Sequence, residues 1–326
     1  MIEVKATEKR KTKMNKIESS DSMFNKMILI ANLYYKEKLS QQEIAKKLNI
    51  SRPWVSKLLA RAEESGIVKI EVMTPFTENA ALESALMHKY YIKHVGVIKS
   101  DNTTRDDLAL AAANYFISEL RPEDIVGVGW GTSVSRLISA TESLCFPKVK
   151  VVPLAGSFGN TMDLFPNLSS IRLAKTINGV AEVIHAPAVC SSPKEYEALM
   201  NNDQTQKLLY MGEHADILLL GMGTFEVSSQ PQFGIFTPGD ITELKAKQVM
   251  GDIALQYLDV NGNPIDTDFT RRLIRANIFK ASANARTSIG IAEGAYKKDI
   301  IHAVLSLKLV NALFTDEETA LALLGI

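Results

Sequence analysis

The sequence predicts an α/β protein in two parts: an N-terminal winged helix-turn-helix domain and a larger, Rossmann-like α/β domain behind it. Helix caps and a sharp turn punctuate residues 40–66, and short apolar strands alternate with helices from residue 92 onward. Charge divides near the same boundary, because residues 1–72 hold 15 Lys and Arg against 9 Asp and Glu, whereas the remainder holds 22 against 28. A basic front on an acidic body suggests that the front meets a polyanion.

The composition of the 326-residue chain, 46% hydrophobic and 23% charged, is typical of a soluble protein of about two domains. Cys145 and Cys190 lack ligand spacing and the five histidines form no metal-binding pair. We therefore expect reduced thiols in a cytoplasmic protein, with no metal and no cofactor. No apolar run reaches about 18 residues, so no membrane association is expected. The lysine-rich N-terminus has no apolar segment behind it and does not match a secretory signal.

The N-terminal part begins with residues 1–21, which show little apolar periodicity and are predicted to form a disordered basic arm. The first folded domain is placed at residues 22–73, with a helix starting near Ser22. Four of its apolar side chains fall at helical spacing: Met27, Ile30, Ala31 and Tyr34.

Local signals in "LSQQEIAKKLNISRPWVSKLLARAEESG" follow one another in the order of a helix-turn-helix unit. Ser40 can cap a short first helix, and Glu43 stands three residues on, as a capping box requires. Asn49 tolerates the positive φ of a sharp turn. Ser51 can cap the second helix, which Gly66 ends. The next residues, "IVKIEV", alternate in polarity and are predicted to form a short strand or wing.

The N-terminal end of the second helix in such a unit enters the major groove of DNA. We therefore expect six residues to face the bases and phosphates of double-stranded DNA: Ser51, Arg52, Trp54, Ser56, Lys57 and Arg61. Trp54 could equally belong to the core, since tryptophan is more often buried than base-reading. The alternative for the whole unit is a small helical hairpin that contacts another protein.

The second part is predicted to begin with a linker helix within residues 74–91, followed by an α/β domain over residues 92–326. Its candidate strands are "KHVGVI", "DIVGVGW", "KVKVVPL", "AEVIHA", "DILLLGMG", "IALQYLDV", "TSIGIA" and "VNALFT". Short apolar strands with helices between them predict a parallel sheet covered on both faces. Ligands of such sheets bind at the carboxyl ends of the strands.

One strand end, "VGVGWGTSVS", places Gly129 and Gly131 before a helix that Thr132 and Ser133 open. Glycines allow a ligand to approach the backbone, and the start of a helix favours an anion to which hydroxyls can donate. The alternative is an ordinary tight turn between strand and helix. A second strand end, "VVPLAGS", offers a possible ligand-facing loop at Gly156 and Ser157.

A third strand end, "SIGIAEGAYKKDII", combines a glycine turn at Gly294 with Lys297 at the start of a helix. A lysine is unfavourable there unless it is solvated or faces a bound anion. Glu293 would repel an anion in the same turn. It could pair with Lys297 or Lys298, or accept hydrogen bonds from the hydroxyls of a sugar.

The helix-turn-helix and seven further motifs together resemble the SorC family of bacterial sugar-responsive transcriptional regulators. These motifs are "GVGWGTSVS", "VVPLAGS", "HAPA", "ADILLLGMGT", "GDIALQYLDVNG", "EGAYK" and "VNALFTDEETALALL", and the resemblance spans roughly residues 25 to 326. It implies a rear domain similar to sugar-phosphate isomerases and glucosamine-phosphate deaminases, used as a sensor without catalysis. It also implies a homo-oligomer, from dimer to tetramer, whose binding to palindromic operator DNA responds to a sugar or sugar-phosphate effector.

Carried onto this sequence, the resemblance implies a phosphate loop at Gly131, Thr132 and Ser133. It implies that Asp252 binds hydroxyls of the effector and that Lys297 binds a phosphate or sugar oxygen. The family pattern has two adjacent glycines in the last turn, and Glu293 replaces the first of them here.

The alternative to a regulator is a sugar-phosphate isomerase or deaminase that carries an accessory helical domain. Such an enzyme needs a positioned base, and Asp252 or Glu293 could supply one. The complete helix-turn-helix pattern favours the regulator, because an isomerase has no use for it.

Overall fold

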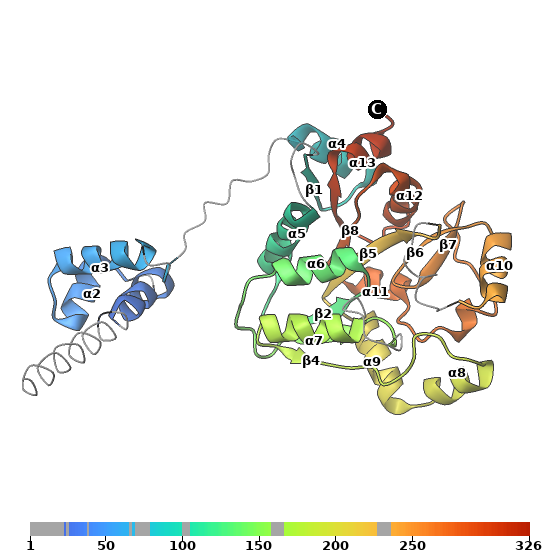
Figure 1. Cartoon of the computed structure of the whole chain (residues 1–326), viewed down its shortest axis with the longest axis horizontal. Coiled ribbons are helices and arrows are strands. Elements are labelled where there is room, and N and C mark those ends of the chain that lie inside the picture. Colours follow the sequence, from blue (N-terminus) through green and yellow to red (C-terminus); the bar gives the residue numbers. More distant parts are fainter. Residues whose placement is uncertain are drawn as a thin grey trace, which may run out of the picture. The chain divides into compact units, whose positions relative to one another are not determined.

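The computed structural model describes residues 23, 26–37, 39–64, 67–68, 79–99, 105–157, 166–226 and 236–326. Contacts divide the chain into two units, Met1–Pro75 and Phe76–Ile326, which are coloured along the sequence in Figure 1. Each unit is described by itself.

The smaller unit is a helical domain around one apolar core. A helix over residues 26–31 continues as a π-helical turn, η1 (Asn32–Lys36), and is followed by α2 (Gln41–Leu48) and α3 (Arg52–Glu64). The helices bury a shared set of side chains that includes Ile30, Leu33, Ile44, Val55 and Leu58. The expected basic arm, Ser22, Gly66 and residues 69–72 of the expected wing lie outside the described residues.

The predicted turn and first cap of the helix-turn-helix are confirmed. The Ser40 hydroxyl accepts a hydrogen bond from the Glu43 amide at 3.3 Å, and the Glu43 carboxylate accepts one from the Ser40 amide at 2.8 Å. Asn49 ends α2 in the left-handed conformation at φ 52°. These local interactions fix where α2 starts and where the chain turns toward α3.

The larger unit is built on a parallel sheet, as predicted, and the strand order is β1-β9-β8-β5-β2-β3-β4. An antiparallel hairpin, β6-β7, extends from the end of β5. The strands are β1 (His94–Ile98), β2 (Ile125–Val128), β3 (Lys150–Pro153), β4 (Val180–Ala181), β5 (Ile217–Thr224), β6 (Val249–Ile253), β7 (Gln256–Asp259), β8 (Thr287–Ile291) and β9 (Ala312–Asp316).

Helices cover both faces of this sheet. The helices of the larger unit are α4 (Ala80–Tyr90), α5 (Arg105–Glu119), α6 (Thr132–Ala140), α7 (Pro166–Thr176), α8 (Pro193–Met200), α9 (Asp203–Glu213), α10 (Pro238–Ala246), α11 (Ile278–Asn284), α12 (Lys298–Ser306) and α13 (Glu317–Leu324), with short 3-10 turns η4 (Thr270–Arg272) and η5 (Ala295–Lys297). Figure 1 shows α5, α6 and α7 together on one face. Along β5, Leu219 belongs to the core beneath these helices and Leu218 to the core beneath α4, α9 and α12. Both faces of the strand are therefore apolar, as a doubly covered sheet requires.

Two expectations about this unit need correction. The stretch "IALQYLDV" is not one strand: Ala254 and Leu255 form a tight turn at φ 49° and 62°, so β6 ends and β7 begins within it. A continuous apolar run without Gly or Pro gives no sequence sign of such a turn. In "AEVIHA" only Ala181 pairs within a strand.

The expected linker helix, α4, contacts β1 and α13 inside the larger unit.

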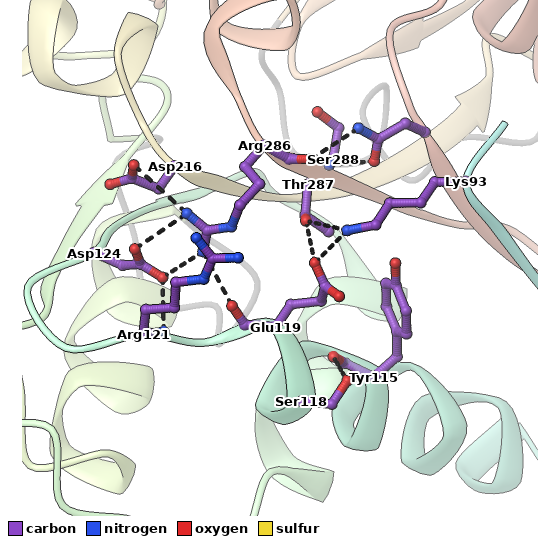
Figure 2. A network of polar contacts seen from close by, with 11 residues as sticks. Lys93, Tyr115, Ser118, Glu119, Arg121, Asp124, Asp216, Arg286, Thr287 and Ser288 are labelled. Atoms are coloured by element: carbon purple, nitrogen blue, oxygen red, sulfur yellow. Dashed lines mark hydrogen bonds and ion pairs between the residues drawn. The ribbon is translucent and has the colours of Figure 1, made fainter.

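A network of charged side chains links the residues that precede the strands (Figure 2). Arg286, just before β8, donates to the Asp124 carboxylate at 2.7 Å and to the Glu119 carbonyl at 3.0 Å. Asp124 directly precedes β2, and Asp216, which directly precedes β5, lies 3.8 Å from the same guanidinium. The network joins the amino ends of three neighbouring strands, β2, β5 and β8, at the edge opposite their carboxyl ends.

Candidate DNA-binding helix and effector site

The exposed face of α3 is basic. The Ser51 hydroxyl accepts a hydrogen bond from the Trp54 amide at 3.4 Å, so Ser51 stands where a helix cap was predicted. Val55 and Leu58 are buried in the core of the unit. The predicted DNA-facing residues on the other side of the helix are exposed: Arg52, Ser56, Lys57 and Arg61.

Trp54 lies partly in the core, which was one alternative considered for it, and its contact with bases stays a prediction. Its side chain is partly buried against the core of the helical unit. The Lys57 ammonium lies 5.7 Å from the centre of its ring, within the range of a cation–π contact. The tryptophan therefore helps to position a cation on the exposed face of α3.

At the carboxyl end of β2, the two candidate glycines are required for different reasons. A Cβ on Gly129 would lie 3.0 Å from the Leu219 carbonyl oxygen, so Gly129 permits the close approach of β2 and β5. Gly131 has φ +111°, and nothing lies within 4 Å of the place where its Cβ would be. Only Gly131 therefore borders open space. Thr132, which is exposed, and Ser133, which is partly buried, then open α6.

Asp252 lies in β6, opposite Gly223 near the end of β5, and is only 4% exposed. One of its carboxylate oxygens accepts hydrogen bonds from the Leu255 amide at 3.1 Å and from the Trp130 indole at 3.3 Å. Asp252 thus holds the strained β6-β7 turn and fixes the side chain just before Gly131. Its expected contact with an effector stays a prediction.

Glu293 pairs with a residue that was not anticipated. Its carboxylate lies 3.4 Å from the guanidinium of Arg136, on α6. The pair crosses β5, which separates β2 from β8 in the sheet. It therefore brings the turn after β8 next to the helix that Thr132 opens. A contact between residues 157 positions apart leaves no spacing signal in the sequence.

The Gly294 turn is held by Asp316 at the end of β9. The Gly294 amide donates to the Asp316 carboxylate at 2.6 Å, and the same side chain caps α13 through the Thr319 amide at 2.8 Å. Gly294 has φ +97°, which favours glycine. Because the Gly294 amide already has a carboxylate acceptor, it is not the donor that would cradle a phosphate. Lys297 is partly buried, with its ammonium 5.7 Å from the centre of the Tyr296 ring.

The loop after β3 is explained by packing. A Cβ on Gly156 would lie 2.5 Å from the Pro187 carbonyl oxygen, so the close approach of the segment around Pro187 requires a glycine here. Ser157 donates through its amide to the Ala186 carbonyl at 2.8 Å and stays partly exposed. Among the described residues, no group of His, Cys, Asp and Glu is arranged to hold a metal ion.

The two units define a protein with a helix-turn-helix domain and an α/β domain of the kind that binds ligands. Known proteins combine the same two parts. A family model described as "Putative sugar-binding domain" matches residues 74–325, and one described as "Homeodomain-like domain" matches residues 28–69. The chain belongs to the SorC family of sugar-binding transcriptional regulators. Within the part of the chain that the structure describes, no helix is long and apolar enough to span a membrane.

Two curated relatives are similar over nearly their whole length. The deoxyribonucleoside regulator of Bacillus subtilis is 32% identical, over 90% of this chain and 96% of its own. The sorbitol operon regulator of Klebsiella pneumoniae is 28% identical, over 94% of this chain and 100% of its own. The crystal structure of the full-length sorbitol operon regulator superposes with a TM-score of 0.70, covering 93% of this chain and 99% of that one. Such relatives are regulators of operons, and the enzyme alternative is not favoured.

Proposed function

We propose that this protein regulates an operon for the use of a sugar or related compound, by binding double-stranded operator DNA through α3. A small sugar or sugar-phosphate effector binds at the carboxyl edge of the sheet and changes the affinity for DNA. The protein acts in the cytoplasm as a homo-oligomer of two to four copies and catalyses no reaction. The names of two relatives, a deoxyribonucleoside regulator and a sorbitol operon regulator, support this class of effector.

The exposed cations of α3 support the DNA contact. Arg52, Lys57 and Arg61 lie on the face opposite the buried Val55 and Leu58. A basic face on the second helix of a helix-turn-helix unit suits both base edges and phosphates. The electrostatic part of such binding weakens with salt in proportion to the number of phosphates contacted.

The ion pair between Arg136 and Glu293 is the observation that carries the effector site. It places the start of α6 beside the turn that contains Gly294, although the two segments are far apart in sequence. The hydroxyls of Thr132 and Ser133 can donate hydrogen bonds to an anionic effector from one side, and Lys297 offers a positive charge from the other. The pair also places a positive charge beside Glu293, which lowers the repulsion that the acid would exert on an anion.

The same contacts argue against catalysis at this edge. A general base needs a carboxylate within reach of the substrate proton. Asp252 is buried and accepts from Trp130 and Leu255, and Glu293 pairs with Arg136. Both candidate bases therefore already make structural contacts, and these contacts would have to break before either carboxylate could act as a base.

The test is a titration of labelled DNA from upstream of the operon with full-length protein. Binding is measured by fluorescence anisotropy at several salt concentrations. Lys57→Ala should weaken binding and lower the slope of log affinity against log salt by about one. Lys245→Ala removes the same charge from an exposed position of α10 and should change neither quantity. Equal affinities and slopes for Lys57→Ala and the parent protein would refute the assignment of α3.

A further inference from the structure

Arg275 is an arginine at the carboxyl edge of the sheet whose guanidinium has no partner at contact distance in the described part of the fold. Its guanidinium makes no ion pair or hydrogen bond with any residue that the structure describes, although the side chain is largely buried. Its near neighbours in sequence are paired: Arg271 with Asp266 at 2.7 Å and Arg272 with Asp240 at 2.8 Å. A guanidinium carries five N–H donors, and no described protein group accepts from those of Arg275.

The backbone places Arg275 at the carboxyl edge of the sheet. It pairs with Ala155 in an isolated antiparallel bridge, at the point where the chain leaves β3. The Gly156 amide donates to the carbonyl of the preceding residue, Ile274, at 2.9 Å. Arg275 therefore lies beside the loop that contains Ser157, at the same edge as the proposed effector site.

The surroundings of the guanidinium suit an anionic oxygen. Burial lowers the pKa of Arg275, and the nearby groups that oppose this shift are Tyr257, Tyr196 and Asp252. Asp252 attracts the guanidinium electrostatically, while one of its oxygens accepts hydrogen bonds from Trp130 and Leu255. The phenol of Tyr196, whose side chain is partly exposed, can donate to the same bound anion as the guanidinium.

We propose that Arg275 binds an anionic group of the effector, a phosphate ester or a carboxylate, at the end of the site that faces β3 and β6. The proposal rests on the effector site proposed above and adds to it a residue that no sequence motif indicated. A neutral sugar would leave the guanidinium without a partner, whereas two anionic oxygens match its fork of donors.

The test compares the melting temperature of the full-length protein in inorganic phosphate, in acetate and in chloride at matched ionic strength. Phosphate or acetate at ten times its Kd should raise the melting temperature of the parent by about 3 to 6 °C. Arg275→Met should abolish this rise. Arg271→Met makes the same change at an exposed, paired neighbour and should keep it.

A second readout separates ligand binding from a structural role. Without added anion, Arg275→Met should melt at or above the temperature of the parent, because the substitution removes a largely buried charge that has no partner. A rise in the variant equal to that of the parent would overturn the proposal, as would no rise in the parent with either anion. A marked loss of stability in anion-free buffer would overturn it too. The salt dependence of Lys57→Ala does not enter these outcomes, so failure here is distinct from failure of the proposed DNA contact.

Discussion

Replacing Arg286 with methionine should destabilise the larger unit substantially. The guanidinium donates to the Asp124 carboxylate at 2.7 Å and to the Glu119 carbonyl at 3.0 Å, and lies 3.8 Å from Asp216 (Figure 2). Methionine keeps much of the aliphatic length but none of the donors. The Asp124 carboxylate, only 7% exposed, would then keep the Arg121 amide as a donor but lose its counter-charge.

The magnitude follows from burial. Exposed ion pairs contribute about 0 to 1 kcal/mol, whereas removing one partner of a buried pair costs about 3 to 5 kcal/mol. The Arg286 side chain is 24% exposed, between these limits and closer to the buried one. We therefore expect a loss of about 2 to 3 kcal/mol. For a unit of this size that loss corresponds to a fall in melting temperature of roughly 4 to 12 °C.

A matched control tests whether burial is the cause. Arg271 also donates through two nitrogens to one carboxylate, Asp266, at 2.8 and 2.7 Å. Its side chain is 63% exposed and that of Asp266 is 68% exposed. Thermal unfolding followed by circular dichroism should therefore show Arg271→Met close to the parent. A similar fall for both variants, or none for Arg286→Met, would refute the reasoning.

Two further results are expected from the same measurement. Burial alone would raise the pKa of Glu119, but hydrogen bonds from Lys93 and Thr287 outweigh it and hold the pKa below its usual value. Its stabilising effect is therefore present above about pH 4.3, the unfolded pKa, and is lost as the pH falls through the lower folded pKa. Glu119→Gln should be less stable than the parent at pH 7, and this difference in stability should disappear in acid. Gly294→Ala should lower the stability by about 1 to 3 kcal/mol, because Gly294 has φ +97° and the new Cβ would lie 2.4 Å from the Tyr296 ring. Adding Tyr296→Ala should restore part of the lost stability. No recovery would show that the ring is not the obstacle.

The helix-turn-helix could be predicted because its signals are local. The capping box joins Ser40 to a residue three positions on, and the turn depends on the conformation of Asn49 alone. The parallel sheet could be predicted because apolar strands and helices alternate along the chain, again a short-range pattern. The β6-β7 turn was missed because Ala254 and Leu255 are neither glycine nor asparagine. The sequence pattern there is that of an uninterrupted strand.

The contacts of the candidate site could not be predicted from the sequence. Asp252 was expected to bind an effector, but no spacing indicated that it would accept a hydrogen bond from Trp130, 122 residues away. The bond from Gly294 to Asp316 likewise depends on β8 and β9 being neighbours in the sheet. Parallel sheets bring together strand ends that are distant in the chain, so the identity of each partner appears only when the strand order is known.

The acid at position 293 illustrates this limit. Seen in the sequence alone, a carboxylate about 5 Å from a bound anion would repel it by on the order of 3 kcal/mol at an effective dielectric constant near 20. In the structure, the Arg136 guanidinium lies 3.4 Å from that carboxylate and would attract the same anion by a similar amount. At 3.4 Å, with side-chain exposures of 32% and 20%, the pair is longer and more exposed than that of Arg286 and Asp124, so it contributes less to stability. Its consequence is electrostatic: the turn is close to neutral, so replacing a glycine of the family pattern with Glu293 does not exclude an anionic effector.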